Sequence, residues 1–338
     1  MQPEVVGGLR PRRLVRLAQQ AVTECALDLD GATVLTEAAT GPYAVTPVLA
    51  ALSGSARVHA VAKPTRHGSV EEVSRQTAEL ASLADVQDRI QLHTDVSREL
   101  VESADVVTNS GHLRPLDSRM IGWMKTDAVV PLMFEAWEID LGRRDVDLEA
   151  LRARGIRFAG TNERHPSVGV FSFLGPMAIR LLTDSAVAVH GSKIVLLCDN
   201  PFRDFLAQGL RAGGAAVWVA ERLADVVLPL DLDAVLVALR PTGSPVLSIE
   251  EVKRISDESP SAVVAQFWGD LPREQCARLG VAVAPVAEPE MGHMGVLPSA
   301  IGPEPVVRLQ AGGLKVASVL LTPPNTWTEW ERSFIDEC

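Results

Sequence analysis

The 338-residue sequence is poor in cysteine, short of basic residues and without a long apolar run, and each shortage excludes a class of protein. Its four cysteines, Cys25, Cys198, Cys276 and Cys338, are scattered, which excludes a CxxC metal site and a secreted disulfide framework. No uninterrupted apolar stretch is long enough to cross a bilayer. A net charge of −11 argues against nucleic acid or an anionic membrane as the main partner.

The start of the chain lacks the apolar core of a signal peptide, although its first residues are basic. Together with the scattered cysteines, this favours a reduced, cytoplasmic setting. A chain of this length with 47% hydrophobic residues is expected to form two domains with substantial cores.

Apolar, strand-like segments alternate with helical segments in two series. The first series has strands near 33–38, 57–63, 104–111, 128–134 and 155–161, and the second has them near 193–198, 216–221, 234–240, 262–268 and 281–287. Amphipathic helices are predicted at 12–28 and from about Thr326 to the end, and a long apolar helix at 168–184 separates the two series. The pattern predicts an α/β protein with two Rossmann- or flavodoxin-like, doubly wound parallel-sheet domains.

The predicted divisions are a helical extension (1–31), a flavodoxin-like substrate domain (32–166), an interdomain helix (167–189), a Rossmann-like nucleotide-binding domain (190–310) and a helical tail (311–338). In parallel sheets, ligands bind beyond the carboxyl ends of the strands. We therefore expect a polar interdomain cleft bordered by the segments NSGH (109–112), NERH (162–165) and EMGH (290–293).

The middle of the chain resembles the D-isomer-specific 2-hydroxyacid dehydrogenases, the formate/glycerate dehydrogenase superfamily. The resemblance rests on three segments: ADVVTNSGHLRPLDSRMIGWM, DVDLEALRARGIRFAGTNERHPSVGVFSF and GSKIVLLCDNPFRDFLAQGLRAGGAAVWVAE. It implies the two-domain fold, a substrate carboxylate held by the turn Asn109, Ser110 and Gly111, and NAD or NADP as cofactor.

The sequence lacks the glycines of that family's phosphate loop. On the match, the three glycines of GxGxxG fall on Cys198, Asn200 and Arg203, and Trp268 stands where the catalytic arginine is expected. Glu221 keeps the place of the acid that accepts ribose hydroxyls. The cofactor-binding candidates are Asp199, Asn200, Arg203, Glu221 and Arg240. Helix capping alone also explains the Asp-Asn-Pro sequence, which is the favoured interpretation of this loop.

Polar residues that follow the strands of the first domain are the candidates for substrate binding: Thr40, Tyr43, Asn109, Ser110, Gly111, Glu135, Asn162, Glu163 and Arg164. Thr40 is also a suitable N-cap, with Pro42 at the first helical position, and Tyr43 then only packs. Capping of the helix beyond Pro166 explains one or two of residues 162–165 but not all four.

The candidates for acid/base catalysis are His112, Glu138, His165, Glu290 and His293. Histidine titrates near neutrality, and a carboxylate three residues away, as in Glu290 and His293, orients an imidazole. Glu135 and Glu138 share one face of a helical turn, where paired acids bind a cation or separate their pKa values. For each, a structural role is the alternative. Nothing in the spacing specifies a metal site, and none is predicted.

Three functions remain open on the sequence. The first is a divergent NAD(P)-linked oxidoreductase of biosynthetic metabolism acting on a small anionic metabolite. The second is a non-redox acid/base or transfer enzyme on the same scaffold, and the third is a catalytically silent binding or scaffolding subunit. Dimerisation through the first domain or the tryptophan-bearing tail is left open.

Overall fold

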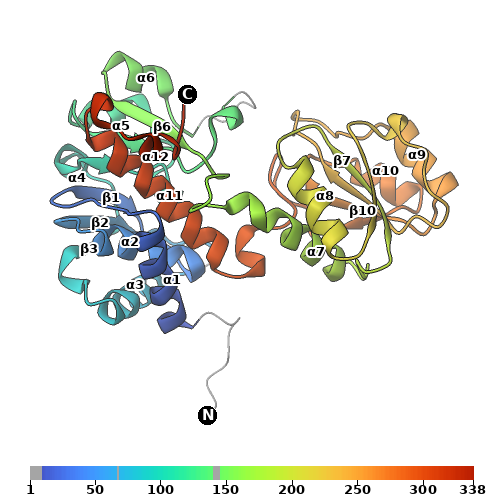
Figure 1. Ribbon diagram of the computed structural model, residues 1–338, viewed down its shortest axis with the longest axis horizontal. Coiled ribbons are helices and arrows are strands. Elements are labelled where there is room, and N and C mark those ends of the chain that lie inside the picture. Colours follow the sequence, from blue (N-terminus) through green and yellow to red (C-terminus); the bar gives the residue numbers. More distant parts are fainter. Residues whose placement is uncertain (1–9, 67, 140–144) are drawn as a thin grey trace, which may run out of the picture. The chain divides into compact units, whose positions relative to one another are not determined.

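The computed structural model describes residues 10–338 apart from residue 67 and residues 140–144. The chain divides into two compact units, which Figure 1 shows coloured along the sequence. Unit 1 comprises Met1–Val170 and Gly302–Cys338, so the end of the chain returns to the unit in which it began. Unit 2 comprises Phe171–Ile301.

Unit 1 is built on a seven-stranded sheet in the order β12-β6-β5-β4-β1-β2-β3. The paired strands are parallel except for β12, which runs antiparallel to β6. The strands are β1 (Thr33–Glu37), β2 (Arg57–Val61), β3 (Ile90–His93), β4 (Val106–Val107), β5 (Val129–Pro131), β6 (Arg157–Thr161) and β12 (Ile335–Asp336).

Alternate residues of these strands face two different layers of helices. Val34, Val58 and Val106 belong to a core with α1 (Pro11–Glu24), α2 (Thr46–Leu52) and α11 (Glu304–Leu321), and α3 (Val70–Leu83) extends this layer. Leu35 and Val107 pack with α4 (Arg98–Ser103), α5 (Ser118–Trp123) and α6 (Leu148–Ala153). The winding therefore reverses between β1 and β4, which is the topological switch point where parallel sheets bind ligands.

Unit 2 contains a five-stranded sheet whose paired strands are all parallel, in the order β11-β10-β9-β7-β8. The strands are β7 (Lys193–Cys198), β8 (Ala216–Ala220), β9 (Ala234–Ala238), β10 (Val263–Trp268) and β11 (Ala282–Ala284). The helices are α7 (Leu174–Asp184), α8 (Arg203–Ala212), α9 (Ile249–Glu258) and α10 (Arg273–Arg278). With β8 on one side of β7 and β9 on the other, the switch point lies between β7 and β9.

Helices α7 and α8 pack closely because a glycine from each lies at their contact. A Cβ atom added to Gly209 would lie 2.3 Å from the Cα atom of Gly175, a separation that no side chain tolerates. The backbones therefore approach as closely as they do only because both positions lack a side chain. This contact joins the helix that opens unit 2 to the helix that follows its first strand.

The predicted fold class is confirmed, namely α/β with two doubly wound parallel sheets, whereas several predicted elements differ. Predicted strands agree to within a few residues, except that β4 is only Val106–Val107. Strand β3 and helices α4 and α11 were not predicted, and α11 is buried along most of its 18 residues. The predicted tail helix from Thr326 is only α12 (Glu329–Arg332), with Thr328 as its N-cap, followed by β12. Within the described part of the chain, no helix combines the length and apolar character needed to cross a membrane.

Candidate functional site

The carboxyl ends of β1 and β4 bring a row of polar side chains to the switch point of unit 1. Thr108 and Ser110, which follow β4, are joined by a 2.8 Å hydroxyl–hydroxyl hydrogen bond, and Thr108 donates to Thr36 of β1 at 2.9 Å. All three side chains are buried. The hydrogen bonds hold the ends of the two strands together, so the residues that follow them are fixed relative to one another.

Glu37, the last residue of β1, is a buried carboxyl at this point, with only 6% of the residue exposed. Burial raises the pKa of Glu37 to about 7. The Arg114 guanidinium and a hydrogen bond from the His112 backbone lower this pKa, but by less than burial raises it. Gly111 makes room for the carboxyl: a Cβ atom there would lie 1.4 Å from Glu37 Oε2. Gly111 is itself exposed, so it lies between this oxygen and the solvent. It covers the carboxyl with its backbone alone, because there is no room for a side chain.

Asn109 adds an unsatisfied donor to the same point. Its side chain is fully buried, and its Oδ1 accepts a 2.7 Å hydrogen bond from the Met133 backbone N–H. Its Nδ2 has no hydrogen-bond partner within the described residues. A buried N–H group without a partner costs about 1–3 kcal/mol, so such groups point to a missing acceptor.

Two further predicted site residues, Tyr43 and His112, interact with Glu37, and a third, Thr40, follows it by three positions in the chain. Thr40 precedes the 3₁₀-helix η1 (Gly41–Val45), whose second residue is Pro42. Burial and the neighbouring Glu37 carboxylate raise the pKa of Tyr43 in this helix. His112 lies in η3 (Gly111–Leu113), where burial and then the nearby Lys63 lower its pKa. The predicted turn 109–111 and these side chains therefore belong to one region.

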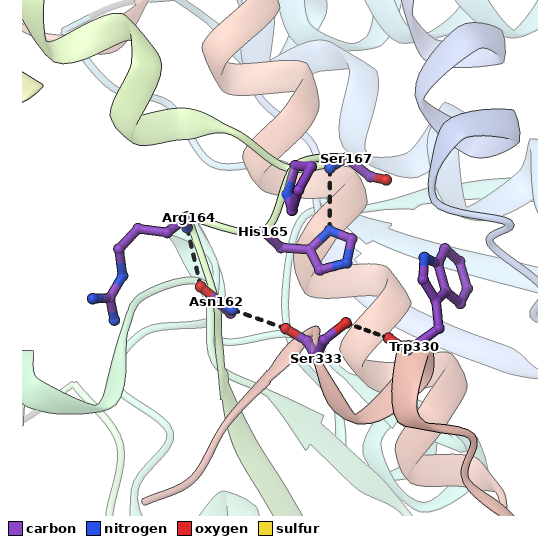
Figure 2. A pocket seen from close by; sticks show the side chains of 7 residues that line it. Asn162, Arg164, His165, Ser167, Trp330 and Ser333 are labelled. Carbon is purple, nitrogen blue, oxygen red and sulfur yellow. Dashed lines mark hydrogen bonds between the residues drawn. The ribbon is translucent and has the colours of Figure 1, made fainter.

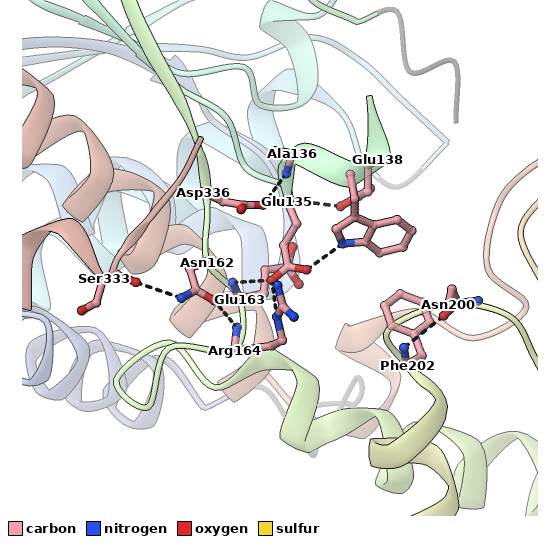
Figure 3. A network of polar contacts seen from close by, with 11 residues as sticks. Glu135, Ala136, Glu138, Asn162, Glu163, Arg164, Asn200, Phe202, Ser333 and Asp336 are labelled. Carbon is pink, nitrogen blue, oxygen red and sulfur yellow. Dashed lines mark hydrogen bonds and ion pairs between the residues drawn. The ribbon is translucent and has the colours of Figure 1, made fainter. Parts of the chain in front are cut away.

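A second cluster lies at the carboxyl ends of β5 and β6, where Glu135 is fully buried (Figure 3). Its Oε1 accepts hydrogen bonds from Arg164 Nε at 3.1 Å and from the Glu163 backbone at 3.2 Å. Its Oε2 accepts the Trp137 indole N–H at 2.6 Å. Burial still raises the pKa of Glu135, with Asp336 acting in the same direction, and the Trp137 and Arg164 contacts oppose this shift.

The other predicted acid of this turn has a structural role. Glu138 Oε1 accepts the backbone N–H of Glu135 at 3.1 Å, so the two acids cap the 3₁₀-helix η4 (Ala136–Glu138). They share one turn, as the sequence predicted. Catalysis by Glu138 stays a prediction.

Asn162, Arg164 and His165 lie after β6 against the C-terminal segment, where they line a pocket (Figure 2). Asn162 binds this segment twice: its backbone N–H donates to Phe334 O at 2.9 Å and its Nδ2 to Ser333 O at 2.8 Å. The His165 imidazole stacks on the Phe334 ring with 3.7 Å between ring centroids. The NERH segment is thus positioned by the last residues of the chain.

The predicted cofactor residues gather at the switch point of unit 2, where they bind one another. Asn200 Nδ2 donates to the Ala238 backbone carbonyl at 2.6 Å, and Asn200 Oδ1 accepts the Phe202 N–H at 3.0 Å. Asp199 Oδ1 accepts the Arg240 backbone N–H at 2.9 Å. These hydrogen bonds tie the turn between β7 and α8 to the end of β9. The capping interpretation is wrong in detail, because α8 begins at Arg203 rather than at Pro201, and its N-cap is Phe202, with no side-chain hydrogen bond, rather than Asp199 or Asn200.

This turn does not fit the pyrophosphate of a dinucleotide in its usual position. The family places glycines there so that the phosphates approach the backbone. Here the Asn200 side chain is hydrogen-bonded within the turn, and acidic residues precede α8 (Asp199) and lie in its first turn (Asp204), which disfavours an anion there. Arg203 forms a 3.4 Å ion pair with Glu221 at the end of β8.

The remaining unit 2 candidates lie in an exposed turn. His293 Nδ1 is 3.5 Å from Glu290 Oε2, and both side chains are more than half exposed. Trp268, where the family has its arginine, is buried and donates its indole N–H to the Gly292 carbonyl at 3.0 Å. Among the described residues, no group of three or more His, Cys, Asp or Glu side chains is placed to hold a metal ion.

Sequence reasoning missed Glu37, Trp330 and Ser333. Glu37 ends the strand-like segment 33–38, so its position directly after an apolar strand was a usable signal. Trp330 and Ser333 reach the NERH segment only because the tail turns back as β12 along β6. Nothing in the local sequence indicates that contact.

Comparisons with known proteins identify the fold. No family model matches the chain, and no curated protein matches it in sequence. A dipicolinate synthase subunit from Bacillus halodurans matches in structure with a TM-score of 0.55 and 11% identity over 87% of this chain and 99% of that chain. The corresponding dipicolinate synthase chain from Bacillus subtilis matches with a TM-score of 0.50 and 12% identity, over 85% of this chain and 95% of that chain. The pyruvate reductase of Chlamydomonas reinhardtii matches with a TM-score of 0.50 and 12% identity, over 92% of this chain and 100% of that chain.

These likenesses extend over nearly the full length of the solved structures, but the identities are low. They confirm the two-domain fold that the resemblance to 2-hydroxyacid dehydrogenases implied. The chain therefore shares the fold of these proteins, and its own chemistry has to be argued from its residues.

Proposed function

We propose that the chain is an enzyme that binds a small carboxylate-bearing metabolite at the carboxyl ends of β1 and β4, and that Glu37 transfers a proton to or from it. The observation that carries the proposal is the buried Glu37 carboxyl, with a pKa of about 7, on the strand next to the unsatisfied Nδ2 donor of Asn109. An acid/base group acts best when its pKa lies near the working pH.

The roles of the surrounding residues follow from their chemistry. Asn109 Nδ2 donates to an oxygen of the metabolite and so gains the acceptor that it lacks in the protein alone. Arg114, whose charge is felt by Glu37, favours an anion nearby. His112 and Tyr43 border the same carboxyl and contribute donors for the rest of the molecule.

Isothermal titration calorimetry of the full chain with pyruvate and with dipicolinate tests this proposal. These two probes are taken from the names of the structural neighbours. A bound carboxylate beside Glu37 raises its pKa further, so binding at pH 7 is expected to take up protons. The proton count follows from titrations in two buffers of different ionisation enthalpy.

Two variants sharpen the result. Glu37→Gln is expected to bind the probe without proton uptake, because the amide does not titrate. Asn109→Ala is expected to bind at least about tenfold more weakly, the value of one buried hydrogen bond to a charged group. Binding of the probes with equal affinity and equal proton uptake in all three proteins would refute the proposal.

The second candidate function is an NAD(P)-linked reaction on the same scaffold. It is supported by Glu221, which directly follows β8, where the ribose-binding acid of nucleotide domains stands. The phosphates would then be held by the Arg203 side chain in place of a glycine backbone. Millimolar NADH or NADPH is expected to raise the melting temperature if this function holds, and no shift with either would remove it.

A further inference from the structure

A pocket of about 610 Å³ lies in unit 1 between the NERH segment and the C-terminal segment (Figure 2). It is lined by Asn162, Arg164, His165, Pro166, Ser167, Trp330 and Ser333. These residues follow β6 or belong to the tail, whereas the site proposed above lies at β1 and β4. The pocket is therefore considered independently of that function.

His165 is a buried donor at the wall of this pocket, with 6% of the residue exposed. Its Nδ1 accepts a 3.1 Å hydrogen bond from the Ser167 backbone N–H. Since Nδ1 is the acceptor, the neutral ring carries its proton on Nε2. Burial lowers the pKa of His165, which favours this neutral form. Within the described part of the chain, no residue accepts the Nε2–H, so the ring retains an unused donor.

The opposite wall is aromatic. Trp330 is 42% exposed and lies edge-on to His165, with 6.1 Å between ring centroids. Phe334 supports both rings from the core of unit 1, stacked on His165 and perpendicular to Trp330. An exposed tryptophan beside a fixed donor suits a ligand with a flat apolar part and an acceptor group.

Two basic side chains lie at or near the pocket. Arg164 lines it, with 47% of its side chain exposed, and Lys315 Nζ stands 5.0 Å from the Trp330 ring centroid. On the acidic side, Glu135 pairs with Arg164. The carboxylate of Glu331, which lies in the same short helix as Trp330, accepts hydrogen bonds from the Thr328 backbone N–H and hydroxyl, both at 2.8 Å. The Glu135 and Glu331 carboxylates, and that of Asp336, which accepts the Ala136 backbone N–H at 2.6 Å, are thus already engaged in hydrogen bonds.

We propose that this pocket binds a small planar carboxylate, whose oxygen accepts the His165 Nε2–H and whose ring packs against Trp330. Benzoate is the probe for this class. Benzamide has the same shape without the charge, and acetate has the charge without the ring. The competing interpretation is that His165 only stacks on Phe334 as part of the core.

The experiment follows the tryptophan indole N–H resonances of the ¹⁵N-labelled full chain by NMR. The chain has six tryptophans, and Trp330→Phe assigns the resonance of Trp330. Benzoate is expected to shift this resonance saturably, with a dissociation constant at least about fivefold lower than those of benzamide and acetate. His165→Phe keeps a ring against Phe334 but removes the donor, and it is expected to weaken benzoate binding by about five- to tenfold.

Trp327→Phe is the matched control, because Trp327 lies in the same tail under Arg332 and does not line the pocket. This variant, Glu37→Gln and Asn109→Ala should all bind benzoate here with unchanged affinity, which separates this proposal from the proposed function. Equal binding of benzoate and benzamide, unchanged binding in a folded His165→Phe variant, or shifts spread over all six indoles would overturn it.

Discussion

Replacing Glu37 by glutamine is expected to stabilise the protein above neutral pH. Glu37 binds its proton more tightly in the folded chain, where its pKa is about 7, than in the unfolded chain, where it is 4.5. The folded state therefore holds more protons between these values, and the free energy of unfolding falls as the pH rises through this window. At 1.36 kcal/mol for each pH unit, the loss reaches roughly 3 kcal/mol by pH 8.

Glutamine has nearly the same shape as glutamate but does not ionise, so Glu37→Gln does not suffer this loss. Urea denaturation of both proteins at pH 5, 6, 7 and 8 is expected to show a difference that grows toward roughly 3 kcal/mol at pH 8. The control is Glu72→Gln. Its carboxyl is exposed and has its pKa lowered to about 2 by hydrogen bonds from Arg75 and Gln76, so its effect should be flat above pH 5. A Glu37→Gln effect that does not grow with pH would refute the reasoning.

Three further changes test the packing of two buried contacts and the pH dependence of a histidine pair. Gly209→Ala places a methyl group 2.3 Å from the Gly175 Cα atom and should destabilise unit 2 by about 1–3 kcal/mol. Urea denaturation measures this loss, and an unchanged midpoint would contradict the close helix contact. Phe334→Ala removes a fully buried ring and should cost about 3–5 kcal/mol, whereas a tail that only rests on the surface would lose almost nothing. His59 Nδ1 and His93 Nε2 lie 3.0 Å apart, and burial lowers the pKa of both rings, so stability falls as the pH drops through 6.5. His93→Gln should reduce this loss in melting temperatures measured between pH 7 and pH 5, and an equal loss would show that the pair is not responsible.

Much of the fold is predictable because burial leaves a direct mark on the sequence. Both faces of a parallel sheet are covered, so strands such as β7 and β9 are continuous apolar runs. Strand β3 escaped prediction because it is an edge strand, paired with β2 alone among the described strands, and keeps polar residues such as Gln91. Helix α11 escaped because it is buried along most of its length and carries no amphipathic pattern.

The site was only partly predictable, because hydrogen bonds between distant segments decide which polar residues remain available. Residues 109–111 do follow a strand, β4, as the apolar pattern predicted, and their role in binding substrate stays a prediction. The hydrogen bond from the Asn200 amide to the Ala238 carbonyl could not be predicted, because it depends on the pairing of β7 with β9. The burial of Glu37 depends on the exposed Gly111, which belongs to another strand's loop.

The most direct test of the central claim is a carboxyl titration of Glu37 by ¹³C NMR in the full chain, with Glu37→Gln used to assign its resonance. A midpoint near pH 7 is the predicted result, because the carboxyl is buried. A midpoint near 4.5, the value of an exposed glutamate, would contradict the account of Glu37 as the acid/base of this protein.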